Sequence, residues 1–281
     1  MQKSKIIIII AALALGIYIF TLPKGVIKKE EANVSANRDT KPIPKNNTME
    51  KTHSVKTSDK ENNNLKLLTK NYNTVSNPEK KIIFADSLAN KYRKLHLYDS
   101  ATKYIEIIAN AKANTEAYSI AGDFNFEAYS FSDKEDRNKF NEKARRFYNK
   151  ALEITPKDYE VKCKLAMTFV GGENPMEGIG ILKEVLKEDP KNETAMYQLG
   201  ILSLQSGQNS KAVDRFNELI KINPKNANAH YYLGVSFANL GEINKAKASL
   251  EKAKALEEDK GFRAAVDDYL KELNSQELIS K

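Results

Sequence analysis

The sequence is poor in the residues that form cross-links or bind metals. Its 281 residues include one cysteine, no tryptophan and three histidines. A single cysteine excludes an intrachain disulfide and any zinc site built from several cysteines. Cys163 falls among apolar residues at a helical position, where we expect a buried hydrophobe rather than a reactive thiol. Packing must therefore supply the stability of any folded body.

Motifs that carry chemistry are also missing. The sequence has no phosphate-binding loop, dinucleotide fingerprint or nucleophile elbow. Neither His96 nor His230 has a carboxylate or cysteine at metal-ligand spacing beside it. The acidic runs at 257–259 and 267–268 fit solvated helix ends better than an acid–base pair. We therefore expect no enzymatic activity, no catalytic residue, no bound metal and no cofactor.

Excess charge is confined to the start of the chain. The formal net charge is +8, and residues 1–80 hold 14 Lys and Arg against 7 Asp and Glu, whereas residues 81–281 hold 31 against 30. The two parts therefore carry +7 and +1. A body that gripped nucleic acid through many phosphates would need a basic face, so we expect no nucleic-acid partner.

Only one long apolar run occurs, and it lies at the N-terminus. Ile6 to Leu22 are 17 residues without a charge, and eleven of them are Ile, Leu or Phe. Their insertion into a bilayer is favourable by on the order of 3 to 7 kcal/mol, and the length is near the lower limit for a span. We expect an uncleaved single-pass anchor over residues 1–23, in contact with the lipid bilayer.

A cleaved signal peptide is the competing interpretation, because Lys3 and Lys5 precede the apolar run. The residues that follow the run lack a small-x-small cleavage pattern. Flanking charges do not settle the orientation, since long C-terminal domains cross a membrane largely regardless of charge. We expect a cell-membrane protein with an extracytoplasmic (periplasmic) soluble domain, and a cytoplasmic one stays open.

Residues 24–77 are rich in Lys, Asn, Thr, Ser and Glu and show no apolar period before Leu65. Such a segment buries too little apolar area to offset the entropy of ordering. We predict a disordered basic and polar linker here, in which residues 65–72 can form a short helix that docks on the body.

The body, residues 78–281, is a repeat. Residues 193–226 and 227–260 align at a period of 34 without a gap. Both have a Leu-Gly pair, a glycine midway and an alanine after it. Small residues let two antiparallel helices approach closely, and the midway glycines Gly207 and Gly241 allow a left-handed turn. Pro224 ends its helix because it lacks the amide hydrogen needed to continue.

This pattern resembles the tetratricopeptide repeat in its length and in its Leu-Gly, Ala, Phe and Pro positions. The resemblance extends to a third unit at 159–192, to a fourth near 115–158 with about ten extra residues at 130–142, and to a divergent fifth that begins at Asn77-Pro78. An amphipathic helix at 262–273 would cap the array. The fold class implied is all-α: an α-solenoid of about five helix pairs and a capping helix, preceded by a transmembrane helix and a linker.

The resemblance implies that the first helix of each pair lines a concave groove. Aromatic and amide side chains dominate its expected positions on two repeats. The candidate partner-binding residues are Tyr197, Gln198, Ile201, Tyr231, Tyr232 and Asn239. Tyrosines half-buried between neighbouring repeats are the alternative interpretation. Some family members clamp a chaperone C-terminus with Lys and Asn, but the corresponding positions here include Tyr197, Ile201 and Tyr231, so we do not carry that clamp over.

The expected function is that of a membrane-tethered adaptor or scaffold that binds another protein or a peptide segment in the groove. Such a layout is similar to ancillary subunits of bacterial envelope-assembly or secretion complexes. A structural protein that forms homo-oligomers is the alternative, and an enzyme of unrecognised type is a weaker one. The oligomeric state and the partner stay open.

Overall fold

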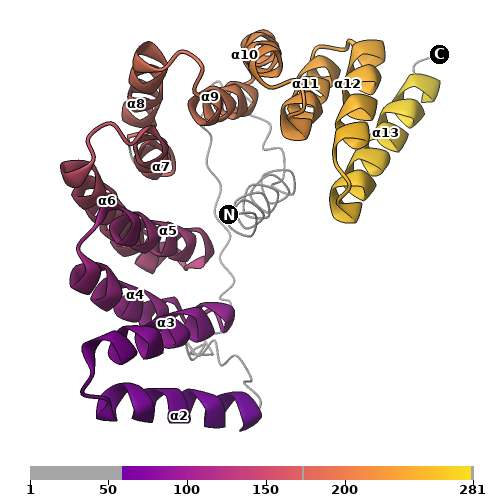
Figure 1. Ribbon diagram of the computed structural model, residues 1–281. Helices are drawn as coiled ribbons and strands as arrows, with labels where there is room; N and C mark the ends of the chain where they lie inside the picture. Colours follow the sequence, from indigo (N-terminus) through magenta and orange to yellow (C-terminus); the bar gives the residue numbers. More distant parts are fainter. Residues whose placement is uncertain (1–58, 173, 280–281) are drawn as a thin grey trace, which may run out of the picture. The chain divides into compact units, whose positions relative to one another are not determined.

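A computed structural model describes residues 59–172 and 174–279 of the chain (Figure 1). Its contacts divide the chain into residues 1–52 and 53–281, and all described residues belong to the second unit. The predicted anchor and the linker up to residue 58 lie outside the described residues. Within the described ranges no strand occurs, and no helix is long and apolar enough to cross a membrane.

Twelve helices make up the described part, and they confirm the predicted all-α class. Their bounds are α2 (Asp59–Thr74), α3 (Pro78–Lys94), α4 (Tyr98–Lys112), α5 (Thr115–Phe131), α6 (Lys134–Ile154), α7 (Tyr159–Val170), α8 (Pro175–Glu188), α9 (Glu193–Gln205), α10 (Asn209–Ile222), α11 (Ala227–Asn239), α12 (Ile243–Leu256) and α13 (Lys260–Ile279).

The helices stack in chain order, as expected of a solenoid. Each helix from α2 to α12 packs on the next one. Additional contacts join α5 to α7, α7 to α9 and α9 to α11. We call α3, α5, α7, α9 and α11 the first helices and α4, α6, α8, α10 and α12 the second helices. Figure 1 shows α6, α8 and α10 on the opposite side of the stack from α5, α7 and α9. The first helices therefore share one face, which we call the first-helix face.

Side-chain caps fix where the first helices begin. Asn77, Asn114, Asp158, Asn192 and Asn226 each accept a hydrogen bond from the backbone N–H three residues later. This cap satisfies one of the four N–H groups that a helix start leaves without a partner. The predicted cap at Asn77, followed by Pro78, is confirmed. The repeats predicted at 159–192, 193–226 and 227–260 each contain one helix pair.

Glycine lets the paired helices touch. A Cβ added at Gly200 would lie 2.7 Å from the ring of Phe216, and one added at Gly234 would lie 2.7 Å from Cγ of Leu250. A Cβ added at Gly122 would overlap the ring of Tyr148, which is 1% exposed. The predicted close approach of paired helices at small residues is therefore confirmed, and in these three pairs a large side chain of the second helix fills the space that the glycine leaves.

The predicted linker is too long at its C-terminal end. Helix α2 occupies 59–74, so it includes and exceeds the short helix expected at 65–72. Leu68 and Tyr72 pack against a core cluster formed by α3 to α6, and the Tyr72 ring meets the Tyr104 ring edge-on at 5.2 Å. These apolar contacts offset the cost of ordering a polar helix, which composition alone did not reveal.

The fourth unit has longer helices instead of the longer connection expected from residues 130–142. Only residues 132–133 separate α5 from α6. Phe140 explains the difference, because it is 1% exposed and packs with Tyr98 and Ala128. At the same end, the Tyr129 hydroxyl donates a hydrogen bond to the carbonyl of Gly171 in the next pair. The extra residues therefore extend the packed surface.

Left-handed residues close three of the turns between paired helices. Gly207 and Gly241 have φ of +72° and +77°, as predicted. In the α3–α4 turn the same role falls to His96, with φ of +56°. A side chain in this region costs free energy that glycine avoids. The His96 ring compensates in part by contacting the rings of Tyr98 and Phe131.

The predicted cap is present and longer than expected. Helix α13 covers 260–279 and buries an apolar stripe against α12. The stripe consists of Phe262, Val266, Leu270 and Leu273. Its charged residues Arg263, Asp268 and Lys271 stay exposed, so α13 ends the stack with a polar surface.

We predict opposite effects of alanine at two helical glycines. Gly122→Ala should lower the free energy of unfolding by about 1 to 3 kcal/mol, because the new methyl group overlaps the buried Tyr148 ring. Gly180→Ala, where nothing lies within 4 Å, should raise it by up to about 1 kcal/mol. Urea unfolding followed by circular dichroism measures both, and equal effects would contradict the packing described.

Candidate functional site

The six predicted groove residues lie on two neighbouring first helices. Tyr197, Gln198 and Ile201 belong to α9, and Tyr231, Tyr232 and Asn239 belong to α11. The two helices contact each other directly. The fold therefore brings most of the set together on one part of the first-helix face, which we call the α9–α11 face.

The three tyrosines form an aromatic cluster between repeats. The Tyr197 and Tyr232 rings meet edge-on at 5.7 Å, and Tyr232 stacks on Phe216 of α10 at 5.8 Å. Tyr231 contacts Tyr232 at 5.1 Å. Such pairs stabilise by about 0.5–1.5 kcal/mol beyond the area they bury. The alternative interpretation of these tyrosines, half-buried between repeats, therefore describes their packing.

The cluster extends to the cap. The Tyr231 ring lies 5.8 Å from Phe262 and 6.4 Å from Tyr269, both on α13. Sequence reasoning missed Phe216, Phe262 and Tyr269 as members of this cluster. The helical spacing of Phe262 and Tyr269 indicated only that both belong to one apolar stripe, and it could not place that stripe against Tyr231.

Burial changes the acidity of these phenols. Loss of solvent raises the pKa of Tyr197 well above its usual value, and the neighbouring Tyr232 adds to the effect. Burial likewise raises the pKa of Tyr231 and of Tyr269 to about 12. All of them are neutral phenols at physiological pH, so the cluster presents aromatic surface without charge.

Asn239 has a different environment. It is exposed at the end of α11, and its side-chain amide donates to the Asn209 side chain of α10 at 3.3 Å. It therefore lies at the edge of the α9–α11 face, beside the turn between α9 and α10.

Unpaired amides cover the remainder of this face. Among the described residues, no hydrogen bond engages the side-chain amides of Gln198, Gln205 and Asn228. Ile201 and Val235 are half-buried beside them. The α9–α11 face thus combines a cluster of aromatic rings, two half-buried aliphatic side chains and amide groups that are free to hydrogen-bond with a ligand.

The first-helix face of the preceding pairs is charged. Lys164 of α7 forms an ion pair with Asp123 of α5 at 2.9 Å, and Arg93 of α3 forms one with Glu127 of α5 at 3.3 Å. Burial raises the pKa of the Glu127 carboxyl, while Arg93 lowers it. Cys163 of α7 is 1% exposed, and burial raises its thiol pKa to about 12, as expected of a packing residue.

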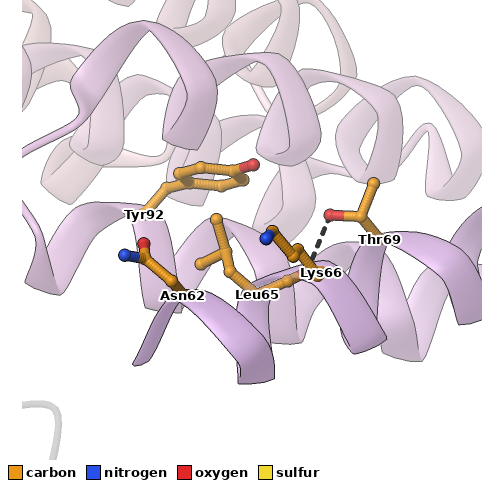
Figure 2. Close-up of a pocket in the computed structure, with 5 residues that line it drawn as sticks. All are labelled: Asn62, Leu65, Lys66, Thr69 and Tyr92. Atoms are coloured by element: carbon orange, nitrogen blue, oxygen red, sulfur yellow. Dashed lines mark hydrogen bonds between the residues drawn. The ribbon is translucent and has the colours of Figure 1, made fainter. Parts of the chain in front are cut away.

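A shallow pocket of about 360 Å³ lies elsewhere, between α2 and α3. Figure 2 shows its five lining residues, with the Tyr92 ring above Leu65 and with the Thr69 hydroxyl bonded to the Leu65 carbonyl at 2.9 Å. Asn62 and Lys66 complete the wall. These groups do not converge on a common point, and the pocket lies apart from α9 and α11. Within the described ranges, no group of three His, Cys, Asp or Glu could hold a metal ion.

We predict that Tyr231 and Tyr269 ionise at a higher pH in the folded protein than in the unfolded chain, and that the folded protein loses stability in strong alkali. The unfolded chain ionises its tyrosines near pH 10, whereas Tyr231 and Tyr269 ionise near 12 when folded. Their contribution to stability is therefore fully present below about pH 10 and is lost as the pH rises through about 12, at no more than about 1.4 kcal/mol per pH unit for each.

Ultraviolet absorbance of phenolate against pH measures this. In the double variant Tyr231→Phe/Tyr269→Phe, the late-titrating signal should shrink by two phenols while the helical circular dichroism at neutral pH is unchanged. Ionisation of every tyrosine in the ordinary range without unfolding would contradict the buried cluster.

Family models match the part of the chain where the last two repeats are predicted. A family model described as "TPR repeat" matches residues 202–241, and one described as "Tetratricopeptide repeat" matches residues 227–260, the last predicted unit. No curated protein matches the sequence.

Two solved structures are similar to this chain at low sequence identity. A crystal structure of MamA is 18% identical, covers 64% of this chain and 93% of its own, and has a TM-score of 0.44. YrrB, described as a TPR protein with an unusual peptide-binding site, is 18% identical, covers 73% and 99%, and has a TM-score of 0.42. Residues 202–260 of the chain, which contain α10, α11 and α12, are thus similar to the tetratricopeptide repeat.

Proposed function

We propose that this chain is a membrane-tethered adaptor that holds a segment of a partner protein on its first-helix face. The observation that carries the proposal is the α9–α11 face, where amides without hydrogen-bond partners lie around an ordered aromatic cluster. An extended polypeptide presents free N–H and C=O groups at every residue, so unpaired glutamine and asparagine side chains complement it.

The packing of the tyrosines changes how they would contribute. Because Tyr197, Tyr231 and Tyr232 contact one another and Phe216, their rings are held in place before any ligand arrives. A rigid aromatic surface loses little conformational entropy on binding. In this proposal the cluster is the floor on which the partner lies, and Gln198, Ile201 and Val235 are the residues it touches first.

The membrane tether rests on the sequence. The uncharged run from Ile6 to Leu22 is the proposed anchor, and the basic excess of the chain follows it closely. An adaptor fixed this way would gather its partner beside a membrane, and an ancillary role in an envelope-assembly or secretion complex fits that layout. The near-neutral body beyond residue 80 gives no support to a nucleic-acid partner. The proposal includes no catalytic step and no cofactor.

Affinity capture with the full chain tests the adaptor role. The variant Gln198→Ala/Ile201→Ala/Val235→Ala truncates side chains of the α9–α11 face and removes no ring of the aromatic cluster. We expect it to lose a partner that the original chain retains, with affinity at least about tenfold weaker. Met176→Ala is the matched control, because this methionine is 71% exposed on a second helix, α8.

Equal capture by all three proteins, with unchanged helical circular dichroism, would refute the groove. Light scattering on the same samples addresses the homo-oligomer alternative. A stable monomer disfavours that alternative, whereas a specific oligomer abolished by the triple variant would replace the adaptor role with self-association.

Fusion of a reporter after Lys281 tests the proposed topology. An enzyme that is active only outside the cytoplasm should be active in this fusion, because the proposal puts the repeats on the extracytoplasmic side. Deleting residues 6–22 should abolish both that activity and recovery of the protein in the membrane fraction. Activity only from a cytoplasmic reporter would reverse the orientation while leaving the adaptor role untouched.

A further inference from the structure

We infer that the α9–α11 face selects an uncharged segment of its partner, one whose apolar side chains and bare backbone cross α9 and α11 without a charged residue. This inference rests on the proposed function and adds the chemical class of the ligand. It comes from a difference in charge between helices that occupy equivalent places in the same stack.

Three equivalent positions show the difference. Counted from the start of each repeat, positions 2, 9 and 13 of α5 carry acids, whereas those of α9 and α11 carry none. The residues are Glu116, Asp123 and Glu127 on α5; Thr194, Ile201 and Gln205 on α9; and Asn228, Val235 and Asn239 on α11.

Charged residues are scarce along the full length of α9 and α11, not only at these three positions. Helix α11 contains no Asp, Glu, Lys or Arg. Helix α9 contains one, Glu193 in its first turn, and this carboxylate accepts a hydrogen bond from Asn223 at 2.9 Å. Their second helices α10 and α12 are rich in charge, so the absence is confined to the first-helix face.

The position of a first helix in the stack does not require its exposed residues to be uncharged. On α5 and α7 the same face accommodates charge by pairing it, as in Lys164 with Asp123 and Arg93 with Glu127. Helices α9 and α11 offer a charged side chain of a ligand no such partner of their own, since Glu193 accepts a hydrogen bond from Asn223 and the bordering Glu160 of α7 accepts one from Thr194. Removing the ligand's charged side chain from water without a counter-charge is costly, so the face discriminates against it.

Neutral hydrogen bonds and apolar contact remain as the attractive terms. The amides of Gln198, Gln205 and Asn228 can bond to main-chain groups, which every sequence provides. Ile201 and Val235 contribute apolar contact at the matched position 9. The α9–α11 face thus gains specificity by excluding charged ligand segments. Binding should depend little on salt concentration, because no ion pair forms.

Selection from a random peptide library displayed on phage tests the inference, with the full chain immobilised in mild detergent. We expect the enriched peptides to be depleted of Asp, Glu, Lys and Arg at their centre. Placing a lysine or an aspartate at the centre of a selected peptide should weaken its binding at least about tenfold. Affinity should change less than about threefold between about 0.05 and 0.5 M salt.

A charge-swap variant supplies the second arm. Gln205→Glu/Asn228→Glu/Asn239→Glu introduces the acids that α5 carries at two of the matched positions, and Gln205 and Asn239 are exposed, so the fold should tolerate them. It should reverse the selection toward lysine- and arginine-containing peptides. Ser210→Glu/Asn244→Glu/Ala248→Glu adds the same charge at exposed positions on the second helices and should leave the selection unchanged.

The outcomes distinguish the inferred selectivity for uncharged segments from the proposed function itself. Enriched peptides that are charged, and that lose binding in the variant Gln198→Ala/Ile201→Ala/Val235→Ala, would overturn this inference and keep the proposed function. No enrichment, or enrichment of peptides that ignore every first-helix variant, would overturn both.

Discussion

The structure depends on how closely two antiparallel helices can approach. At Gly122, Gly200 and Gly234 the absence of a side chain lets a large residue of the second helix rest on the backbone of the first. Every later feature follows from this contact, because it fixes the distance within a pair and hence the face that the first helices share. A stack built this way needs only neighbouring contacts, so each pair can vary its exposed residues without disturbing the rest.

That freedom explains why the exposed chemistry changes along one face. Pairing of Asp123 with Lys164 and of Glu127 with Arg93 makes the face polar at α5 and α7, whereas the corresponding residues of α9 and α11 are neutral. The aromatic cluster then joins α9, α10, α11 and α13 into one rigid surface. Function on such a scaffold resides in the substituted positions rather than in the fold itself.

Much of the fold could be predicted from the sequence, because the 34-residue period marks the close contacts directly. The pairs at 159–192, 193–226 and 227–260, the turns at Gly207 and Gly241 and the cap at Asn77 are where the pattern predicts them. What composition could not show was long-range apolar contact: Phe140 holds the extra residues of α6 in a helix, and Tyr72 holds α2 on α3 and α4. The six predicted groove residues lie on α9 and α11, but the helical pattern could not show that their tyrosines pack on Phe216 and Phe262.

The greater length of the α5–α6 hairpin affects how the helix pairs find their correct neighbours during folding. Repeats of similar length and pattern can pair with the wrong neighbour during folding, since each offers nearly the same apolar surface. The α5–α6 hairpin is longer than the others and makes contacts of its own on both flanks, through Phe140 against Tyr98 of α4 and through Tyr129 bonded to Gly171 after α7. These contacts favour the native order of helix pairs over an order in which α5–α6 has other neighbours.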